Sequence, residues 1–344
     1  MKKLVLVIMV LAFAAGAVGY YAVRRLNEPF QGYEGAEQFV EIPSGANTRT
    51  IGDTLIAKGV IRDEITYRLA LWRSGEARHL QAGEYRFDHP MTPGDVLGKI
   101  ARGEVYTVAI TFPEGLTIAE MAKIFEAHGF GTAAAFTAAA KNAALAKAFD
   151  PAARDLEGYI FPDTYNVPRR TDATALVHLM FERFEKVLTP DIRQAASERG
   201  LNVRQLVTLA SIVEKETAQP GERPEVAAVY TNRLKRGMAL QCDPTVIYAL
   251  ERVGKYDGNI RKDDLMFDSP YNTYRYPGLP PGPIAAPGRA SIEAAAHPSD
   301  DDYLYFVSRN DGSHAFARTL DEHNRNVQQY QIQYFRARRA AERH

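Results

Sequence analysis

The stretch Leu206-Val-Thr-Leu-Ala-Ser-Ile-Val-Glu-Lys-Glu-Thr217 predicts a core helix that ends in a carboxylic acid. At roughly 100° per residue, Glu216 projects from the apolar face of this helix and Glu214 projects almost oppositely. The apolar face is formed by Leu206, Leu209, Ile212 and Val213. A carboxyl group on that face loses hydration, which raises its pKa and suits a general acid near neutral pH. The pattern equally allows the helix to end in solvent, closed by Gln219-Pro220-Gly221.

The whole chain has the composition of one large or two moderate globular domains. It contains 344 residues, of which 46% are hydrophobic and 24% charged. Its formal net charge of zero gives no support for nucleic acid as a partner. Cys242 is the lone cysteine, so an intrachain disulfide is excluded and stability must come from the core.

The N-terminus predicts a membrane anchor. Leu4 to Val23 is a run of 20 residues without a charge, flanked by Lys2-Lys3 and Arg24-Arg25. As a helix this run spans about 30 Å, the thickness of a bilayer's hydrocarbon core. Ala15-Gly16-Ala17 resembles a signal-peptidase site, but the run is longer than a usual signal-peptide core, so we favour a retained anchor. Residues 1–3 then form a cytoplasmic tail, although two basic residues on each side leave the orientation undecided by charge.

Beyond the anchor, the pattern predicts a linker and a small α/β module. Residues 24–38 are polar and lack periodicity, as expected of a linker. Residues 39–104 read as a compact unit, with Thr92 as the N-cap of its last helix and Pro93 at that helix's first position. The expected elements are strands at 39–42 and 83–87 and helices at 51–58, 64–72 and 92–101.

Residues 105–344 predict a larger mixed domain, so the fold class is α+β. The phrase Phe112-Pro-Glu-Gly115 repeats the pattern of Ile42-Pro-Ser-Gly45, which hints at an internal repeat. Near the C-terminus, Asn310-Asp311-Gly312 is a good hairpin turn. The expected helices are 118–128, 133–149, 173–188, 203–217, 224–235, 244–251 and the basic 320–343; the expected strands are 106–112, 303–307 and 314–318.

Several kinds of chemistry find no support in the sequence. The histidines form no His-x-x-x-His pair and do not cluster with Cys242, which argues against a zinc site. Gly-x-Ser-x-Gly, Gly-x-Gly-x-x-Gly and P-loop motifs are absent. We therefore expect no metal and no cofactor.

Polar and aromatic residues in the last third of the chain are those that stack on and hydrogen-bond sugars. Tyrosine rings supply apolar faces, and amides supply paired donors and acceptors. The predicted substrate-binding set is Gln241, Asp243, Thr245, Tyr271, Asn272 and Tyr274. For Asp243 an equal alternative is the N-cap of the helix Pro244–Glu251.

Five phrases together resemble the YceG-like family, in the family's order. They are Leu156-Glu-Gly-Tyr-Ile-Phe-Pro-Asp-Thr-Tyr165, Ala210-Ser-Ile-Val-Glu-Lys-Glu-Thr217, Leu240-Gln-Cys-Asp-Pro-Thr-Val-Ile-Tyr248, Tyr271-Asn-Thr-Tyr274 and Gly278-Leu-Pro-Pro-Gly-Pro-Ile284. The resemblance implies an inner-membrane protein with one span, a LysM-like module and a periplasmic catalytic domain. It also implies cleavage within nascent peptidoglycan strands, association with peptidoglycan synthases (penicillin-binding proteins), and Glu216 as the catalytic acid. The chain departs from the family at Cys242, where a threonine is common.

The implied reaction is that of a lytic transglycosylase, which needs one carboxyl group rather than the pair of an ordinary glycosidase. Glu216 would act as general acid and then as base, and the products would end in 1,6-anhydroMurNAc. One alternative is a muramidase-type hydrolase in which Asp243 positions water. Another is a membrane-anchored binding module that recruits synthases. A PLP-dependent lyase is disfavoured, because Lys215 lies neither near a glycine-rich phosphate site nor on the apolar face.

Overall fold

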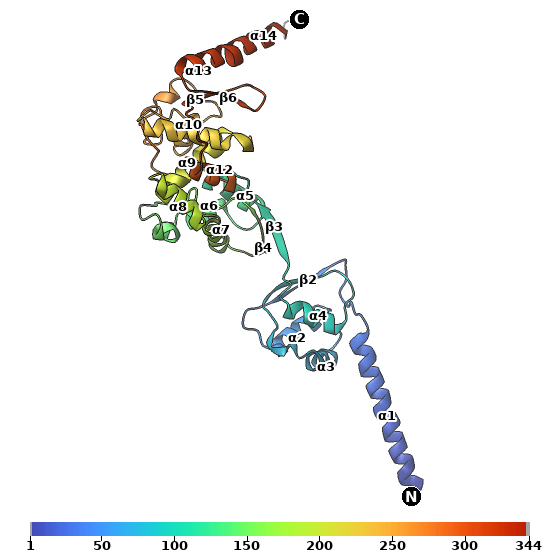
Figure 1. Cartoon of the computed structure of the whole chain (residues 1–344). Helices are drawn as coiled ribbons and strands as arrows, with labels where there is room; N and C mark the ends of the chain where they lie inside the picture. The colour runs from blue at the N-terminus through green and yellow to red at the C-terminus, as the bar shows by residue number, and fades with distance from the viewer. Residues whose placement is uncertain (1, 342–344) are drawn as a thin grey trace. The chain divides into compact units, whose positions relative to one another are not determined.

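The computed structural model describes residues 2–341, which form two compact units. The smaller unit is Met1–Val108 with Asn166–Arg169, and the larger is Ala109–Tyr165 with Arg170–His344. Short two-stranded sheets accompany many helices, which confirms the mixed class of the fold (Figure 1).

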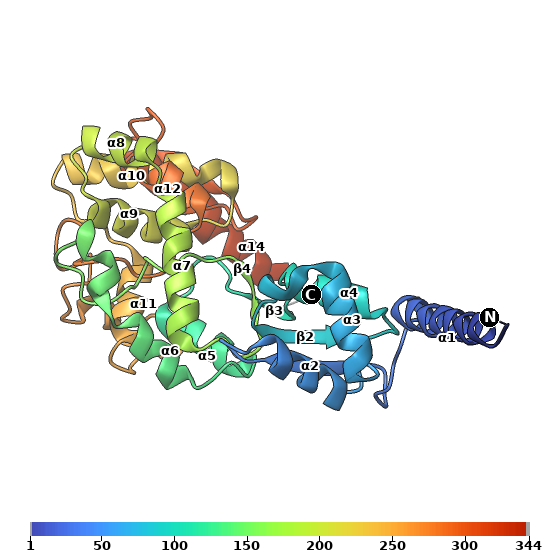
Figure 2. The same cartoon turned by 90° about the horizontal axis from the view of Figure 1, so that it is seen from below.

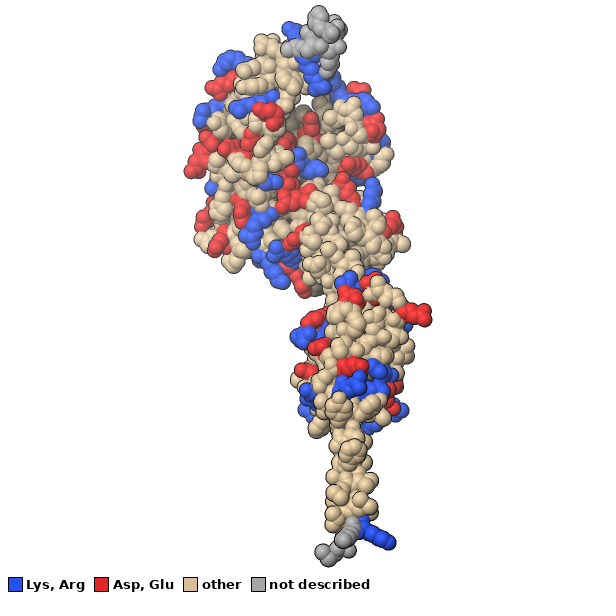
Figure 3. Space-filling view, turned by 90° about the vertical axis from the view of Figure 1, so that its right-hand side faces the viewer, with Lys and Arg blue, Asp and Glu red and all other residues tan. Residues whose placement is uncertain are grey.

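An apolar helix, α1 (Lys2–Asn27), opens the chain. Residues Lys3–Asn27 are long and apolar enough to cross a membrane, and the predicted span 4–23 lies inside them. Figure 3 shows that the middle of this helix carries no charged side chains, whereas its free end is basic. The expected linker begins later than predicted, because residues 24–27 continue the helix. The linker also packs against the small unit, because Tyr33 lies in its core and Phe30 forms a β-bridge with Met91.

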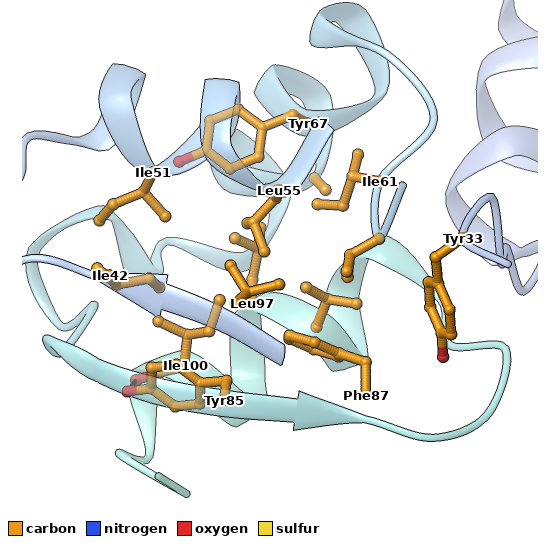
Figure 4. Packing of buried hydrophobic residues seen from close by; sticks show 14 residues of the cluster. Tyr33, Ile42, Ile51, Leu55, Ile61, Tyr67, Tyr85, Phe87, Leu97 and Ile100 are labelled. Atoms are coloured by element: carbon orange, nitrogen blue, oxygen red, sulfur yellow. Dashed lines mark hydrogen bonds between the residues drawn. The ribbon is translucent and has the colours of Figure 1, made fainter. Parts of the chain in front are cut away.

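The small unit is a two-stranded antiparallel sheet covered by helices. In the sheet, Val40 of β1 lies opposite Tyr85 of β2. Apolar side chains from both strands and all three helices meet in one core, which includes Leu55 and Leu97 (Figure 4). Thr92 caps α4 as predicted, with Pro93 at the first position. The elements are β1 (Gln38–Ile42), α2 (Thr48–Ala57), α3 (Glu64–Ser74), η1 (Glu76–Arg78), β2 (Gly83–Phe87) and α4 (Pro93–Ala101).

Two strands cross the boundary between the units. β3 (Thr107–Thr111) pairs with β4 (Thr164–Pro168), and the division falls inside each strand. The domain limit expected between residues 104 and 105 is therefore found between 108 and 109, four residues later. The segment Asn166–Arg169 also belongs to the small unit. Gly45 and Gly115, the last residues of the two similar phrases, share a left-handed backbone with φ of 76° and 77°.

The large unit is built around α9 (Val203–Glu216). Every side chain from Leu206 to Val213 is buried, so the helix is enclosed on all sides rather than on one face. Figures 1 and 2 show α9 among α8, α10 and α12. The helices and turns before it are α5 (Ile118–Ala127), α6 (Ala133–Ala140), η2 (Ala143–Ala148), α7 (Ala173–Val187) and α8 (Pro190–Glu198). Those after it are η3 (Pro220–Glu222), α10 (Arg223–Lys235), α11 (Asp243–Glu251), η4 (Asp264–Met266) and α12 (Arg289–Ala296).

A hairpin and a segmented helix complete the large unit. β5 (Tyr305–Ser308) and β6 (His314–Ala317) are antiparallel, as the turn signal predicts. The expected helix 320–343 is observed as α13 (Leu320–Val327), the π-helical η5 (Gln328–Gln333) and α14 (Tyr334–Ala341). Residues 342 and 343 of the expected helix lie outside the described part of the chain.

Candidate active site

Glu216 is the last residue of α9, and its carboxyl group is turned into the protein. The helix begins at an Asn202–Gln205 capping box and ends at Thr217, whose backbone is extended. The hydroxyl of Tyr230, on the neighbouring helix α10, donates a 2.7 Å hydrogen bond to Oε1 of Glu216. The helix therefore does end where the sequence allows it to, yet Glu216 is only partly exposed and its carboxyl group is hydrogen-bonded within the protein.

The surroundings of Glu216 favour its neutral form. Burial raises the pKa of the carboxyl group and outweighs the hydrogen bonds from Cys242 and Tyr230, which lower it. The charge of Asp243 also raises this pKa, whereas His314 lowers it. Burial likewise raises the pKa values of Tyr230 and Cys242, so both remain protonated donors at neutral pH. A carboxylic acid held this way can give up a proton near neutral pH.

Glu216 opens into a pocket of about 300 Å³ assembled from six parts of the chain. Helix α9 supplies the acid, α10 supplies two side chains, and the segment from Leu240 to the start of α11 supplies three. The loop that holds Tyr274, strand β5 and helix α13 each supply an aromatic ring. The lining residues are Glu216, Tyr230, Arg233, Leu240, Gln241, Asp243, Tyr274, Phe306 and His323.

Three of the six predicted substrate-binding residues line this pocket: Gln241, Asp243 and Tyr274. Asp243 is the first residue of α11, and Cys242 holds the N-cap position that was the alternative for Asp243. The Asp243 carboxylate accepts a 2.5 Å hydrogen bond from the Tyr274 hydroxyl instead. Gln241 has a left-handed backbone with φ of 51°, a strained conformation of the kind that clusters at functional sites.

The other three lie elsewhere. Asn272 is completely buried; its Nδ2 donates to the carbonyls of Leu265 and Phe267, and its Oδ1 accepts from the Tyr274 amide. Thr245 is also completely buried and bonds the carbonyl of Cys242 at 2.7 Å. Neither side chain lines the pocket, and their polar groups bond to nearby backbone carbonyls.

Tyr271 lines a second pocket, of about 320 Å³, at the far end of α11. Its hydroxyl accepts a 3.1 Å hydrogen bond from Arg252, and its ring packs edge-on against Tyr248. The buried Glu157 lies in the same pocket, where it accepts hydrogen bonds from the Ile118 amide and the Tyr248 hydroxyl. The predicted set is thus divided among the Glu216 pocket, the buried interior and a second pocket.

Glu214 is also buried, but it is paired. Its side chain is only 7% exposed and forms a 3.3 Å ion pair with Arg223. It also accepts hydrogen bonds from the Ser291 hydroxyl at 2.7 Å and the Gly288 amide at 2.9 Å. The two acids of α9 therefore differ in their partners more than in their burial.

Sequence reasoning missed several residues around Glu216. Tyr230 lies 14 positions beyond the acid, on another helix, so no local motif marks it. Arg233 is buried and donates to the carbonyls of Leu304 and Leu240. His323 is held neutral because burial, followed by the charge of Arg233, lowers its pKa.

A second histidine, His314, lies next to the pocket wall. Nδ1 of His314 lies 2.7 Å from Oε2 of Glu222, and the backbone amide of His314 donates to Oε1 of the same carboxylate. The His314 ring packs edge-on against Phe306 of the pocket wall. Within residues 2–341, no group of three or more potential ligands is placed to hold a metal ion.

An enclosed acid of raised pKa in a polar pocket is the arrangement of an enzyme that uses general acid catalysis. Residues 40–329 match the model of the YceG-like family, and the chain belongs to that family. A relative from Bacillus subtilis, named endolytic murein transglycosylase, is 32% identical over 85% of this chain and 84% of its own length. A relative of the same name from Streptococcus pneumoniae is 32% identical over 94% of this chain and 64% of its own length.

The solved structures agree with this assignment. A YceG-like protein from Listeria monocytogenes matches with a TM-score of 0.57 and 30% sequence identity. The match covers 84% of this chain and 98% of the Listeria chain.

Proposed function

We propose that the protein is an endolytic murein transglycosylase, a glycosidic bond lyase. It cleaves the β-1,4 bond from MurNAc to GlcNAc within nascent peptidoglycan strands, leaves 1,6-anhydroMurNAc ends and so limits glycan elongation. The family and the names of two relatives support the activity. The observation that carries the mechanism is the Glu216 carboxyl group, enclosed in a pocket, bonded to Tyr230 and without an ion-pair partner among the described residues.

In the first step, neutral Glu216 protonates the oxygen of the scissile bond. Tyr230 donates to Oε1, which leaves Oε2 as the oxygen that carries the acidic proton in this proposal. The bond from the MurNAc anomeric carbon to that oxygen breaks, and GlcNAc leaves with the proton as an alcohol. The sugar that remains carries positive charge at its anomeric carbon, as in other glycosidic cleavages.

In the second step, the Glu216 carboxylate removes the proton from the MurNAc 6-hydroxyl. That oxygen forms a bond to the anomeric carbon, which closes the 1,6-anhydro ring and restores neutral Glu216. The nucleophile belongs to the substrate, so the reaction has the advantage of proximity and needs no second carboxylate. Hydrogen bonds from Tyr230 and Cys242 stabilise the transient carboxylate, because bonds to a charged acceptor are stronger.

A hydrolase is the competing mechanism, because Asp243 also lines the pocket and could position water. The products decide between the two. Peptidoglycan digested in H₂¹⁸O by the purified protein should give anhydro ends without the isotope, as measured by mass spectrometry. Reducing MurNAc ends that carry ¹⁸O would contradict the proposal and establish a muramidase.

The same proposal places the enzyme in the cell's inner membrane. Helix α1 is a single-pass anchor, residues 1–3 are cytoplasmic, and the catalytic domain lies in the periplasm. The small unit is a LysM-like module, and peptidoglycan synthases are the partners. The apolar helix supports the anchor, and the separate core of the small unit supports its description as a module. Protease treatment of intact spheroplasts should remove the catalytic domain, whereas complete protection would contradict the orientation.

A further inference from the structure

Helix α3 of the small unit exposes two large apolar side chains on one face. Ile65 is 73% exposed and Trp72 is 83% exposed. They are the two most exposed large apolar residues outside α1 in the part of the chain that the structure describes. Seven positions correspond to two helical turns, so both side chains project from the same face of α3. The active-site pocket involves neither residue.

Both ends of helix α3 contact the C-terminal end of α1. Asp63, the N-cap of α3, forms a 3.2 Å ion pair with Arg25. Near the C-terminus of α3, Arg73 donates a 3.3 Å hydrogen bond to the side chain of Asn27. Both helices belong to the small unit. Figure 1 shows α3 on the side of the small unit where α1 ends.

These contacts fix the depth of α3 relative to the apolar helix. The charge-free run of α1 ends at Val23, and Arg25 lies about 3 Å further along the axis. The polar headgroup layer on each side of a bilayer is roughly 5–7 Å thick. The N-cap of α3 therefore starts within headgroup depth when α1 spans a membrane.

The charges beside Trp72 also suit the surface of a bilayer. Trp72 borders a groove between α2 and α3 that is also lined by Arg49, Arg68, Asp53 and Glu64. Arg68 forms an exposed ion pair with Glu64 at 3.6 Å, so the local charges largely compensate each other. An aromatic ring accompanied by flexible charged side chains is typical of the interfacial layer of membranes.

We propose that α3 lies on the lipid surface beside the α1 span, with Trp72 and Ile65 inserted into the interfacial layer. The partner is a phospholipid bilayer. The inference goes beyond the catalytic proposal and rests only on α1 spanning the membrane. It means that the small unit is held against the membrane by a second contact in addition to its covalent anchor.

Trp72 is the chain's single tryptophan, so the unmodified protein carries its own probe. The full chain is reconstituted into phosphatidylcholine vesicles, and its fluorescence is recorded with brominated lipids and with aqueous iodide. We expect emission at shorter wavelength than that of a solvated indole, strong quenching by lipids brominated near the headgroup, and little quenching by iodide. Emission and iodide quenching like those of free tryptophan, without bromolipid quenching, would overturn the proposal.

Two variants and one fractionation complete the test. Ile65→Ser should weaken bromolipid quenching of Trp72, whereas Leu179→Ser, an exposed apolar position of the large unit, should leave it unchanged. Equal effects of the two variants would contradict the proposal. Retention of the protein in alkali-washed vesicles with a solvated Trp72 refutes the surface contact alone, whereas release refutes the span and the contact together. A Trp72 that is shielded only when a second protein is added would identify a protein interface and also refute it.

Discussion

Replacing Tyr230 with phenylalanine removes one hydroxyl group and leaves the packing of the site in place. The Tyr230 side chain is almost completely buried, and its ring packs edge-on against Phe306. Phenylalanine keeps this contact and loses the 2.7 Å hydrogen bond to Glu216 together with the side-chain hydrogen bond to Cys242. The substitution therefore tests the contribution of the Tyr230 hydroxyl to the reaction.

The expected loss follows from the strength of a hydrogen bond to a charged acceptor, about 1.5–3 kcal/mol. If the bond reaches full strength only when Glu216 is a carboxylate, the rate falls roughly 10- to 150-fold. The bond also lowers the pKa of Glu216, so its loss raises that pKa further. The acid must be protonated to act, and the alkaline limb of the pH–rate profile should therefore move to higher pH.

The assay is the release of soluble muropeptides from peptidoglycan across a range of pH. Tyr276→Phe is the matched control, because its hydroxyl also donates to a carboxylate, that of Asp268, but on an exposed surface. The control should keep both the native rate and the native profile. A native rate and an unshifted profile for Tyr230→Phe would refute the role of this hydrogen bond.

Three further substitutions test other parts of the account. Burial raises the pKa of Glu157 from 4.5 to about 8, so the folded state holds an extra proton between these values and stability falls as pH rises through that window. In the native protein this loss of unfolding free energy amounts to up to roughly 5 kcal/mol, and Glu157→Gln should remove it. Urea unfolding at several pH values measures the effect, and an unfolding free energy that falls with pH as steeply in the variant as in the native protein would contradict it. Glu214→Gln breaks the buried ion pair with Arg223 and should cost about 3 kcal/mol of stability while the folded fraction stays active; inactive folded protein would implicate Glu214 in catalysis. Gln241→Gly should be about 1 kcal/mol more stable than Gln241→Ala in thermal unfolding, because glycine relieves the left-handed backbone; equal stabilities would show that this backbone is unstrained.

Local patterns predicted most elements of the fold, because hydrophobic periodicity and caps are local signals. Strand 83–87 and helix 64–74 begin at the predicted residues, and Thr92 caps its helix. Helix α8 was not predicted, because most of its residues are polar and Ile192 is too isolated to give a clear apolar pattern. Strand β4 was not predicted either, since its pairing with β3 joins residues more than 50 positions apart.

The candidate site shows the same limit. Helical phase separated Glu216 from Glu214, but it could not show that the Glu214 side chain is also shielded from solvent or that Arg223 neutralises it. Residue type alone placed Asn272 in the substrate set, whereas its side-chain amide donates both of its hydrogen bonds to backbone carbonyls of the loop. Tyr230 carried no signal, because its role exists only through the packing of α10 against α9.

The reaction of Glu216→Gln shows whether the Glu216 carboxyl group is the catalytic acid. Glutamine keeps the shape of the side chain and can still accept from Tyr230, but it has no acidic proton to give. Glu185→Gln, an exposed acid on α7, is the matched control. With folding verified by circular dichroism, the account predicts that Glu216→Gln releases no anhydro-ended fragments while Glu185→Gln releases them at the native rate. Release of these fragments by Glu216→Gln at the native rate would contradict it.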